Sequence, residues 1–263
     1  MSEVCTIPYD FGGRDARIRM HACGGRDQVV RQAMASGWRS YEAPMPLVLS
    51  RLITARPCAF LDIGANTGFY ALMAAHAGAA QVRAYEPVPA IASILAANIA
   101  HSFGPDTAAV QLHRLALSDR CGEAELFLPD QGHGLIETSA SLNPEFRAVH
   151  AGAVRVSLAS LDAHLQDQPI ALQLALVIKL DVESVEPQVL AGAEQTVARH
   201  RPAIVVEILP GSDLRFYADW LERHHYCHYQ LLPPNQIVPA ATIETSLQHR
   251  DHLLLPAEFP LPF

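Results

Sequence analysis

Apolar runs of strand length alternate with stretches of helical periodicity along the chain from residue 58 onward. Runs rich in aliphatic and β-branched residues predict strands at 58–64, 81–87, 110–119, 174–183 and 202–209. Stretches with apolar residues at helical spacing predict helices at 67–78, 89–102, 186–200 and 212–225. Two closing runs that begin at Tyr226 and Asp251 predict an antiparallel pair. This alternation indicates a doubly wound, mostly parallel α/β sheet of seven strands that helices cover on both faces.

Two segments do not follow this alternation. Residues 1–57 contain Gly-Gly pairs and precede the first strand, and we interpret them as an N-terminal cap, partly helical, that lies over the sheet. Residues 129–153 are polar and show no clear period. They predict an inserted lid, because a loop of that length in a compact domain is usually functional or mobile. We therefore expect one domain at 58–263 with an N-terminal extension.

Composition and charge exclude several classes of protein. Half of the 263 residues are apolar and 17% are charged, which allows a large core. The net charge of −8 argues against a nucleic-acid-binding protein, because such proteins normally carry a basic face. Five scattered cysteines without a CxxC pair are typical of reduced thiols, and the chain begins without a signal-peptide pattern. The longest apolar run, near 170–178, is too short to span a membrane. These features predict a cytoplasmic protein without a nucleic-acid or membrane partner, and they leave a homodimer open.

The stretch FLDIGANTGFYAL (60–72) forms a glycine-rich turn between the first strand and the first helix. In an open parallel sheet, ligands bind beyond the carboxyl ends of the strands, where this turn is expected to lie. Gly64 and Gly68 allow a tight turn, but Asn66 stands where the nicotinamide fingerprint G-x-G-x-x-G requires its second glycine. A ligand without phosphate and with an amino-acid end is therefore favoured. Asp62 could accept a hydrogen bond from the ammonium group of such a ligand.

Glu86 ends the second predicted strand, 22 residues after Gly64. At this position a carboxylate can accept hydrogen bonds from both ribose hydroxyls of an adenosine. Taken separately, Asp62 and Glu86 are equally well explained as solvated strand ends. Their combination with the glycine turn favours a nucleoside ligand.

Five segments follow one another along the chain: FLDIGANTGFYAL, AYEPVPAIASILAANI, LALSDRCGEAELF, VSLASLDAHL and IKLDVESVEPQVLAGAE. Together they resemble the FkbM-type S-adenosylmethionine-dependent methyltransferases over about residues 58–210. The segment LDVESVEPQVLAGAE is the more specific part of the resemblance, which implies the Rossmann-like fold of a class I methyltransferase. The family usually has glycine after D-V-E, where this chain has Ser184. We expect this serine to cap the helix that follows.

The resemblance implies a cofactor site for S-adenosylmethionine. The implied binding residues are Asp62, Gly64, Asn66, Gly68, Phe69, Glu86, Pro87, Ser118, Asp119 and Asp181. The glycine turn is expected to surround the methionine end and Glu86 to hold the ribose. Pro87 is expected at the adenine side, with Ser118 and Asp119 at the adenine edge. Phe69 is equally well explained as core packing on the first helix.

Acidic residues cluster at the predicted ends of the fourth and fifth strands. Methyl transfer to a hydroxyl requires removal of a proton, so Asp181, Glu183 and Glu207 are candidate bases, together with His133 in the lid. Three carboxylates on one rim repel one another unless one is protonated or a cation lies among them. Asp181 could therefore bind Mg²⁺, or it could pair with Lys179, which shares its face of the strand.

These inferences predict a methyltransferase that acts on a hydroxyl of a small molecule, and the resemblance suggests a sugar or a natural product. A nitrogen acceptor, a non-catalytic cofactor-binding subunit and a nicotinamide-dependent oxidoreductase are the alternatives. Trp38, Tyr41 and Glu42 precede the first strand, where the N-terminal segment could close over the cofactor or pack against the core.

Overall fold

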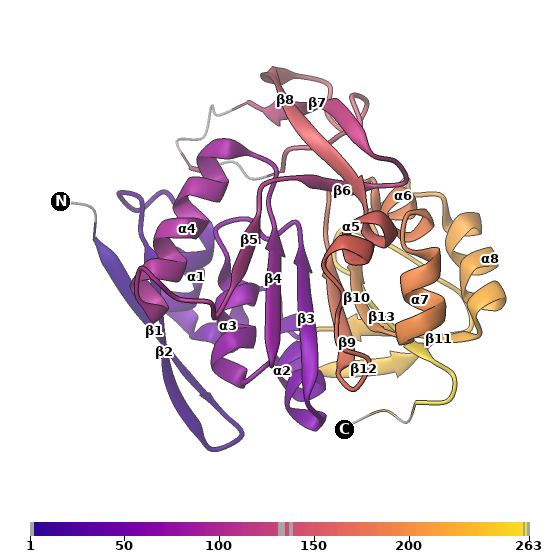
Figure 1. Cartoon of the computed structure of the whole chain (residues 1–263), viewed down its shortest axis with the longest axis horizontal. Helices are drawn as coiled ribbons and strands as arrows, with labels where there is room; N and C mark the ends of the chain where they lie inside the picture. The colour runs from indigo at the N-terminus through magenta and orange to yellow at the C-terminus, as the bar shows by residue number, and fades with distance from the viewer. Residues whose placement is uncertain (1–2, 131–134, 137–138, 260, 262–263) are drawn as a thin grey trace.

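The computed structural model describes residues 3–130, 135–136, 139–259 and 261. Within these residues the chain forms one large sheet, with helices on both faces, and two smaller sheets (Figure 1). The strands of the large sheet, in spatial order, are β12 (Gln236–Pro239), β11 (Tyr226–Leu232), β13 (Asp251–Pro256), β10 (Ala203–Glu207), β9 (Ala175–Leu180), β3 (Cys58–Ile63), β4 (Gln81–Tyr85) and β5 (Gln111–His113). The predicted doubly wound, mostly parallel sheet is confirmed. It contains eight strands among the described residues, where the sequence predicted seven, because the short and largely exposed β12 pairs with β11.

The central strands of the large sheet are parallel and buried on both faces. β3 pairs in parallel with β4 and β9, and β13 pairs antiparallel with β10 and β11, as predicted for the closing runs. Neighbouring residues of β3 belong to different hydrophobic clusters, Phe60 to one and Leu61 to the other. A strand that contributes to two clusters must be apolar along its whole length, which explains the unbroken apolar runs.

Helices build the two clusters against the sheet. One face is covered by α2 (Met45–Ala55), α3 (Phe69–Ala77) and α4 (Pro89–Phe103), and the other by α5 (Leu161–Asp167), α6 (Glu186–Ala191), α7 (Glu194–His200) and α8 (Leu214–His224). The single helix predicted at 186–200 is therefore two helices. A Cβ atom on Gly192 would lie 2.0 Å from the carbonyl oxygen of Ser118, so the chain bends where the two backbones touch. None of the described helices is long and apolar enough to cross a membrane.

The N-terminal segment begins with a β-hairpin that the sequence analysis did not predict. β1 (Val4–Phe11) and β2 (Arg14–His21) pair antiparallel and are followed by α1 (Gln28–Ser36) and the short helix η1 (Trp38–Ser40). Gly12 and Gly13 join the strands with positive φ angles of 60° and 78°. Two successive residues of this conformation are typical of the tightest hairpin turns, so one Gly-Gly pair was the missed signal. The hairpin packs against α3 and α4 and does not lie over the sheet (Figure 1).

Only the two ends of the predicted lid, Pro129 and residues 150–153, lie in strands of a second small sheet, and the described residues between these ends form a loop. The strand predicted at 110–119 divides into β5 and β6 (Ala116–Ser118), and β6 joins β8 (His150–Ser160) and β7 (Gly122–Pro129) in a separate three-stranded sheet. This sheet stands at the top of Figure 1, above the ends of β3 and β4. The sequence suggested no strand at the start of β8, because residues 150–153 are largely exposed and include no large apolar side chain.

The strand order determines where a ligand can bind. From β3 the chain continues to β4 and β5 on one side of the sheet, and it later returns to β9 on the other side of β3. The connections after β3 and β9 therefore diverge and leave a crevice at the carboxyl ends of these strands. The amide of Asp181, directly after β9, donates to the carbonyl of Ile63 at the end of β3 at 3.1 Å.

Candidate functional site

A cavity opens at this crevice. It encloses about 1030 Å³ of empty space, part of which is open to solvent. Its walls come from the glycine turn, the ends of β4, β9 and β10, the small sheet and the N-terminal segment. The lining residues are Val29, Tyr41, Glu42, 63–70, 85–88, 115–117, Leu126, Ala140, Leu142, Lys179, Asp181, Val182, Glu183, Val185, Glu207 and Arg250.

The glycine turn forms the wall between β3 and α3. Gly64 has a φ angle of 80°, and a Cβ atom there would lie 1.8 Å from the carbonyl oxygen of Asp181. Only glycine therefore allows the ends of β3 and β9 to approach so closely. Asp62 is fully buried and does not line the cavity, and its two carboxylate oxygens have no well-aligned hydrogen-bond partner among the described residues. Burial raises the pKa of Asp62 to about 7.

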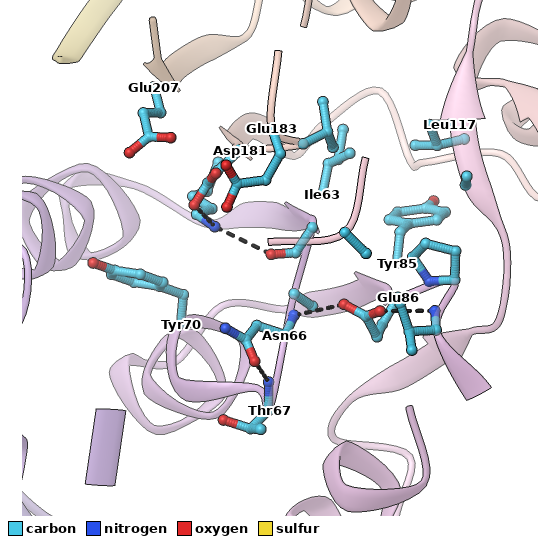
Figure 2. A pocket seen from close by; sticks show the side chains of 18 of the residues that line it. Ile63, Asn66, Thr67, Tyr70, Tyr85, Glu86, Leu117, Asp181, Glu183 and Glu207 are labelled. Atoms are coloured by element: carbon cyan, nitrogen blue, oxygen red, sulfur yellow. Dashed lines mark hydrogen bonds and ion pairs between the residues drawn. The ribbon is translucent and has the colours of Figure 1, made fainter. Parts of the chain in front are cut away.

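Glu86 connects the glycine turn to the end of β4 (Figure 2). One carboxylate oxygen accepts from the amide of Asn66 at 3.0 Å, and the other accepts from the amide of Val88 at 2.8 Å. The side chain lines the cavity although the residue is only 6% exposed, and burial raises its pKa to about 7. Each carboxylate oxygen can accept a second hydrogen bond, so Glu86 can still hold two donors of a ligand.

The wall next to Glu86 is aromatic and apolar. Figure 2 shows Tyr85 and Leu117 on the same side of the cavity as Glu86, away from Glu207. The sequence placed Ser118 and Asp119 at this edge, but residues 115–117 line it instead. The carbonyl of Ser118 is packed against Gly192, and its hydroxyl donates to Asp119 at 3.1 Å, so both residues are held outside the cavity.

The opposite end of the cavity is acidic. The structure brings Asp181, Glu183 and Glu207 together there (Figure 2). Burial, followed by the nearby Asp181, raises the pKa of Glu183 to about 8 and that of Glu207 to about 10. Arg250 Nε lies 3.0 Å from Glu207 Oε1 and partly opposes the shift of Glu207. The described carboxyl groups at this end therefore lack enough nearby positive charge to hold their pKa values in the ordinary range.

Lys179 is the cation in the middle of this end. Its Nζ lies 3.0 Å from Asp181 Oδ2 and donates to the carbonyl of Gly64 at 3.2 Å. The ion pair anticipated from the spacing of the two residues is therefore present, and it also ties β9 to the glycine turn. These contacts do not fit a magnesium site: the ammonium group already lies at Asp181, and among the described residues no group of three or more histidine, cysteine or acidic side chains is arranged to hold a metal.

The N-terminal segment contributes directly to the cavity wall. Tyr41 and Glu42 line it, and the hydroxyl of Tyr70 donates to Glu42 at 2.8 Å. Phe69 lines the cavity as well, and its ring meets that of Tyr41 at a centroid distance of 5.5 Å. Trp38 of η1 instead contacts the hairpin, where its Nε1 donates to Asp10 Oδ1 at 2.8 Å.

Sequence reasoning missed several lining residues. Arg250 is the clearest, although a signal existed: it precedes the closing strand β13, which runs antiparallel to β10 and so begins beside Glu207. Ala140 and Leu142 come from the insert, whose polar sequence suggested no contact. The candidate base His133 lies outside the described residues.

Comparison with known proteins decides the family. Residues 62–231 match the family model described as the methyltransferase FkbM domain. The chain belongs to the FkbM methyltransferase family. No curated protein matches this FkbM methyltransferase in sequence.

Solved structures include distant similarities to this FkbM methyltransferase. Methyltransferase FkbM from Methylobacillus flagellatus KT is 15% identical with a TM-score of 0.49, and the match covers 76% of this chain and 43% of that one. The SAM-dependent methyltransferase from Agrobacterium tumefaciens is 10% identical with a TM-score of 0.47, covering 96% and 70%. An O-methyltransferase from Bacillus cereus in complex with SAH is 12% identical with a TM-score of 0.48, covering 86% and 87%. The chain thus spans less than half of the first of these proteins.

Ser184, which stands where the family usually has glycine, adopts a backbone conformation that favours glycine. Glu183 and Ser184 have φ angles of 58° and 80°, in the left-handed region that favours glycine. The expected helix cap is wrong: Val185 is the N-cap residue of α6, and the Ser184 hydroxyl instead accepts from the side-chain amide of Asn143 at 3.1 Å. The hydroxyl of Ser141, in the same insert, donates to the carbonyl of Glu183 at 2.6 Å. Hydrogen bonds therefore join the insert to the loop that contains Glu183 and Ser184.

Proposed function

We propose that this FkbM methyltransferase transfers a methyl group from S-adenosylmethionine to a hydroxyl of a small molecule, a sugar or a natural product. The observation that carries the proposal is a single cavity with two different ends. A buried carboxylate beside an aromatic wall, at Glu86 and Tyr85, suits an adenosine, and the acidic end at Asp181, Glu183 and Glu207 suits a cationic group (Figure 2). The glycine turn joins the two ends.

The charges of the cavity support a cationic ligand. Among the described residues, five carboxylates and two cations line it. S-adenosylmethionine has a sulfonium and an ammonium group, and opposite charge nearby stabilises the ionised form of a buried carboxylate. Burial raises the pKa of Glu86 to about 7 and that of Glu183 to about 8, and a cationic group nearby would lower both again. When bound, the cofactor would supply a methyl group that the sulfonium activates for in-line displacement.

Removal of the acceptor proton falls to the acidic end. A general base works best when its pKa lies near the working pH, and Glu183 has a pKa of about 8. We therefore assign proton removal to a carboxylate oxygen of Glu183. Asp181 is paired with Lys179 and Glu207 with Arg250, so we assign these two carboxyl groups to orienting the acceptor. His133 remains an alternative base.

A binding and turnover panel tests the proposal. Calorimetry with S-adenosylmethionine, S-adenosylhomocysteine and NADP⁺ should give binding of the first two only. Methyl transfer from labelled S-adenosylmethionine to pooled hydroxyl and amine acceptors should occur equally with Mg²⁺ and with a chelator. Preference for NADP⁺ would overturn the assignment, transfer only to amines would replace the oxygen acceptor with nitrogen, and binding without any transfer would favour the non-catalytic subunit.

Two variants separate chemistry from binding. Glu183→Gln should lower turnover roughly 10²–10⁴-fold, the usual contribution of a general base. Its affinity for S-adenosylhomocysteine should change little. Asp181→Asn should also reduce turnover more than cofactor affinity. If Asp181→Asn instead weakens binding and spares turnover, Asp181 belongs to the cofactor site and not to the chemistry.

A further inference from the structure

A second, smaller cavity adjoins the first. Its lining residues are Asp27, Gln28, Val29, Tyr41, Asn66, Thr67 and Ile136, and four of them, Val29, Tyr41, Asn66 and Thr67, line the main cavity as well. The N-terminal segment, the glycine turn and the insert each supply part of the wall. The amide of Ile136 donates to the carbonyl of Arg26 at 3.0 Å, so insert and N-terminal segment are joined at this point.

Asp27 has one engaged and one unengaged carboxylate oxygen. The residue is 2% exposed, and its Oδ1 accepts from the amide of Val30 at 3.0 Å as the N-cap of α1. Its Oδ2 is buried, and no described residue makes a hydrogen bond to it by distance and angle, although the Thr67 side chain is close enough to lower the pKa of Asp27. The hydroxyl of Thr67, 2% exposed, is likewise buried without a well-aligned partner among the described residues, and Thr67 lines the same small cavity.

Burying the carboxylate of Asp27 and the hydroxyl of Thr67 lowers the stability of the fold unless a ligand supplies the missing hydrogen bonds. A buried polar group without a partner loses its hydration without replacement, and a charged group loses most. Burial raises the pKa of Asp27, and among the described residues no cationic side chain is found among the groups that shift it. Because the cost of desolvating Asp27 is already incurred on folding, a cation that enters gains the attraction at the expense of its own desolvation alone.

We propose that the small cavity binds a protonated amine of the methyl acceptor, with Asp27 Oδ2 and Thr67 Oγ1 accepting its N–H groups. This inference rests on the proposed function and specifies its substrate class as an amino-bearing hydroxyl compound. A neutral hydroxyl would satisfy the hydrogen bond but not the charge. The two cavities share four lining residues and are adjacent, so an acceptor that spans both would place its amine at Asp27 and its reacting hydroxyl at the acidic end. Asp27 precedes residue 62, where the family match begins, so this carboxylate lies outside the matched residues.

The test compares probes that differ only in charge. Ethanolamine, ethylene glycol and N-acetylethanolamine are titrated at constant ionic strength, with and without S-adenosylhomocysteine, and binding is followed by NMR. Ethanolamine should bind at least about tenfold more tightly than either neutral probe, because hydrogen bonds between charged groups are the stronger class. Equal affinities for the three probes would overturn the inference.

Matched variants locate the effect. Asp27→Asn removes the charge but keeps an N-cap acceptor, so α1 should remain folded. It should abolish the preference for ethanolamine, and Thr67→Val should reduce it. Asp213→Asn is the control, because Asp213 caps α8 through the amides of Arg215 and Phe216 and lines neither cavity. A preference that persists in Asp27→Asn would remove Asp27 from the site.

Cofactor binding distinguishes the remaining outcomes. The affinity for S-adenosylhomocysteine should be the same in Asp27→Asn and in the wild type. A clear loss would mean that the small cavity holds the amino-acid end of the cofactor, and the acceptor assignment would fall. Failure of the wild type to bind S-adenosylhomocysteine overturns the proposed function, whereas loss of the ethanolamine preference with intact cofactor binding overturns this inference alone.

Discussion

Asn98 holds the carbonyl of Thr67 through a hydrogen bond of 2.8 Å from its side-chain nitrogen. The side-chain oxygen of the same residue accepts from the amide of His21 at 2.8 Å. One fully buried amide on α4 thus ties the last strand of the N-terminal hairpin to the glycine turn. The hairpin therefore stabilises the geometry of the cavity without lining it.

Asn98→Ala should lower the free energy of unfolding by about 2–4 kcal/mol, because it leaves two largely buried backbone groups without partners. It should also weaken binding of S-adenosylhomocysteine, since Thr67 is no longer held. Urea denaturation and calorimetry measure the two effects. Ser102→Ala is the control: Ser102 bonds the same hairpin strand, at Arg19, but at an exposed position. Equal losses in both variants would show that Asn98 has no special role.

Glu86→Gln should weaken the affinity for S-adenosylhomocysteine at least about tenfold, because a charged acceptor of two hydroxyls becomes a neutral amide. Its free energy of unfolding should fall by about 1–3 kcal/mol, because the one remaining oxygen can accept from the amide of Asn66 or from that of Val88 and leaves the other unpaired. Glu186→Gln is a matched control: Glu186 is equally buried and accepts from the amide of Val182, but it does not line the cavity. An unchanged affinity in Glu86→Gln would remove Glu86 from the cofactor site.

The sheet and the acidic end of the cavity were predictable because they depend on local patterns. A parallel strand buried on both faces is apolar throughout, and the residues after its carboxyl end must lie at the crevice. This reasoning located the glycine turn, Glu86 and Asp181, and the period of two paired Lys179 with Asp181.

The other contributors depend on tertiary contacts that leave little trace in the sequence. The sequence predicted one strand at 110–119 in the large sheet. The chain instead leaves this sheet after His113, and β6 pairs with β8, so that residues 115–117 line the apolar wall in place of Ser118. Asp27 is a helix cap by its sequence, and only the approach of Thr67 and Ile136 encloses its second oxygen. Ser184 was interpreted as a helix cap because serine is a common N-cap residue. Its backbone is instead left-handed, and Val185 is the N-cap of α6.

Ser184→Gly should be more stable than Ser184→Ala, although alanine is usually the more stabilising of the two residues. At a φ angle of 80° a side chain costs about 1–3 kcal/mol, which glycine avoids and alanine does not. Both variants lose the hydrogen bond from Asn143, so the glycine variant should be the more stable by about 1 kcal/mol or more. Thermal or urea unfolding measures the difference. A more stable alanine variant would contradict the left-handed conformation of the loop.

The ligand-free protein should lose stability as the pH rises from about 6.5 to about 8. Glu183 has a folded-state pKa of about 8 against an ordinary value of 4.5, and Glu86 one of about 7, so the folded protein binds more protons than the unfolded chain in this window. Their contribution is complete below the ordinary value and is lost as the pH passes the raised one. Below 6.5 the buried His252, with a pKa of about 3, acts in the opposite sense, because the unfolded chain protonates first. Urea denaturation at several pH values measures the slope, which Glu183→Gln should make shallower. A flat or rising stability across this window would show that the pKa values of Glu183 and Glu86 are not raised. The charge argument for a cationic ligand would then fail.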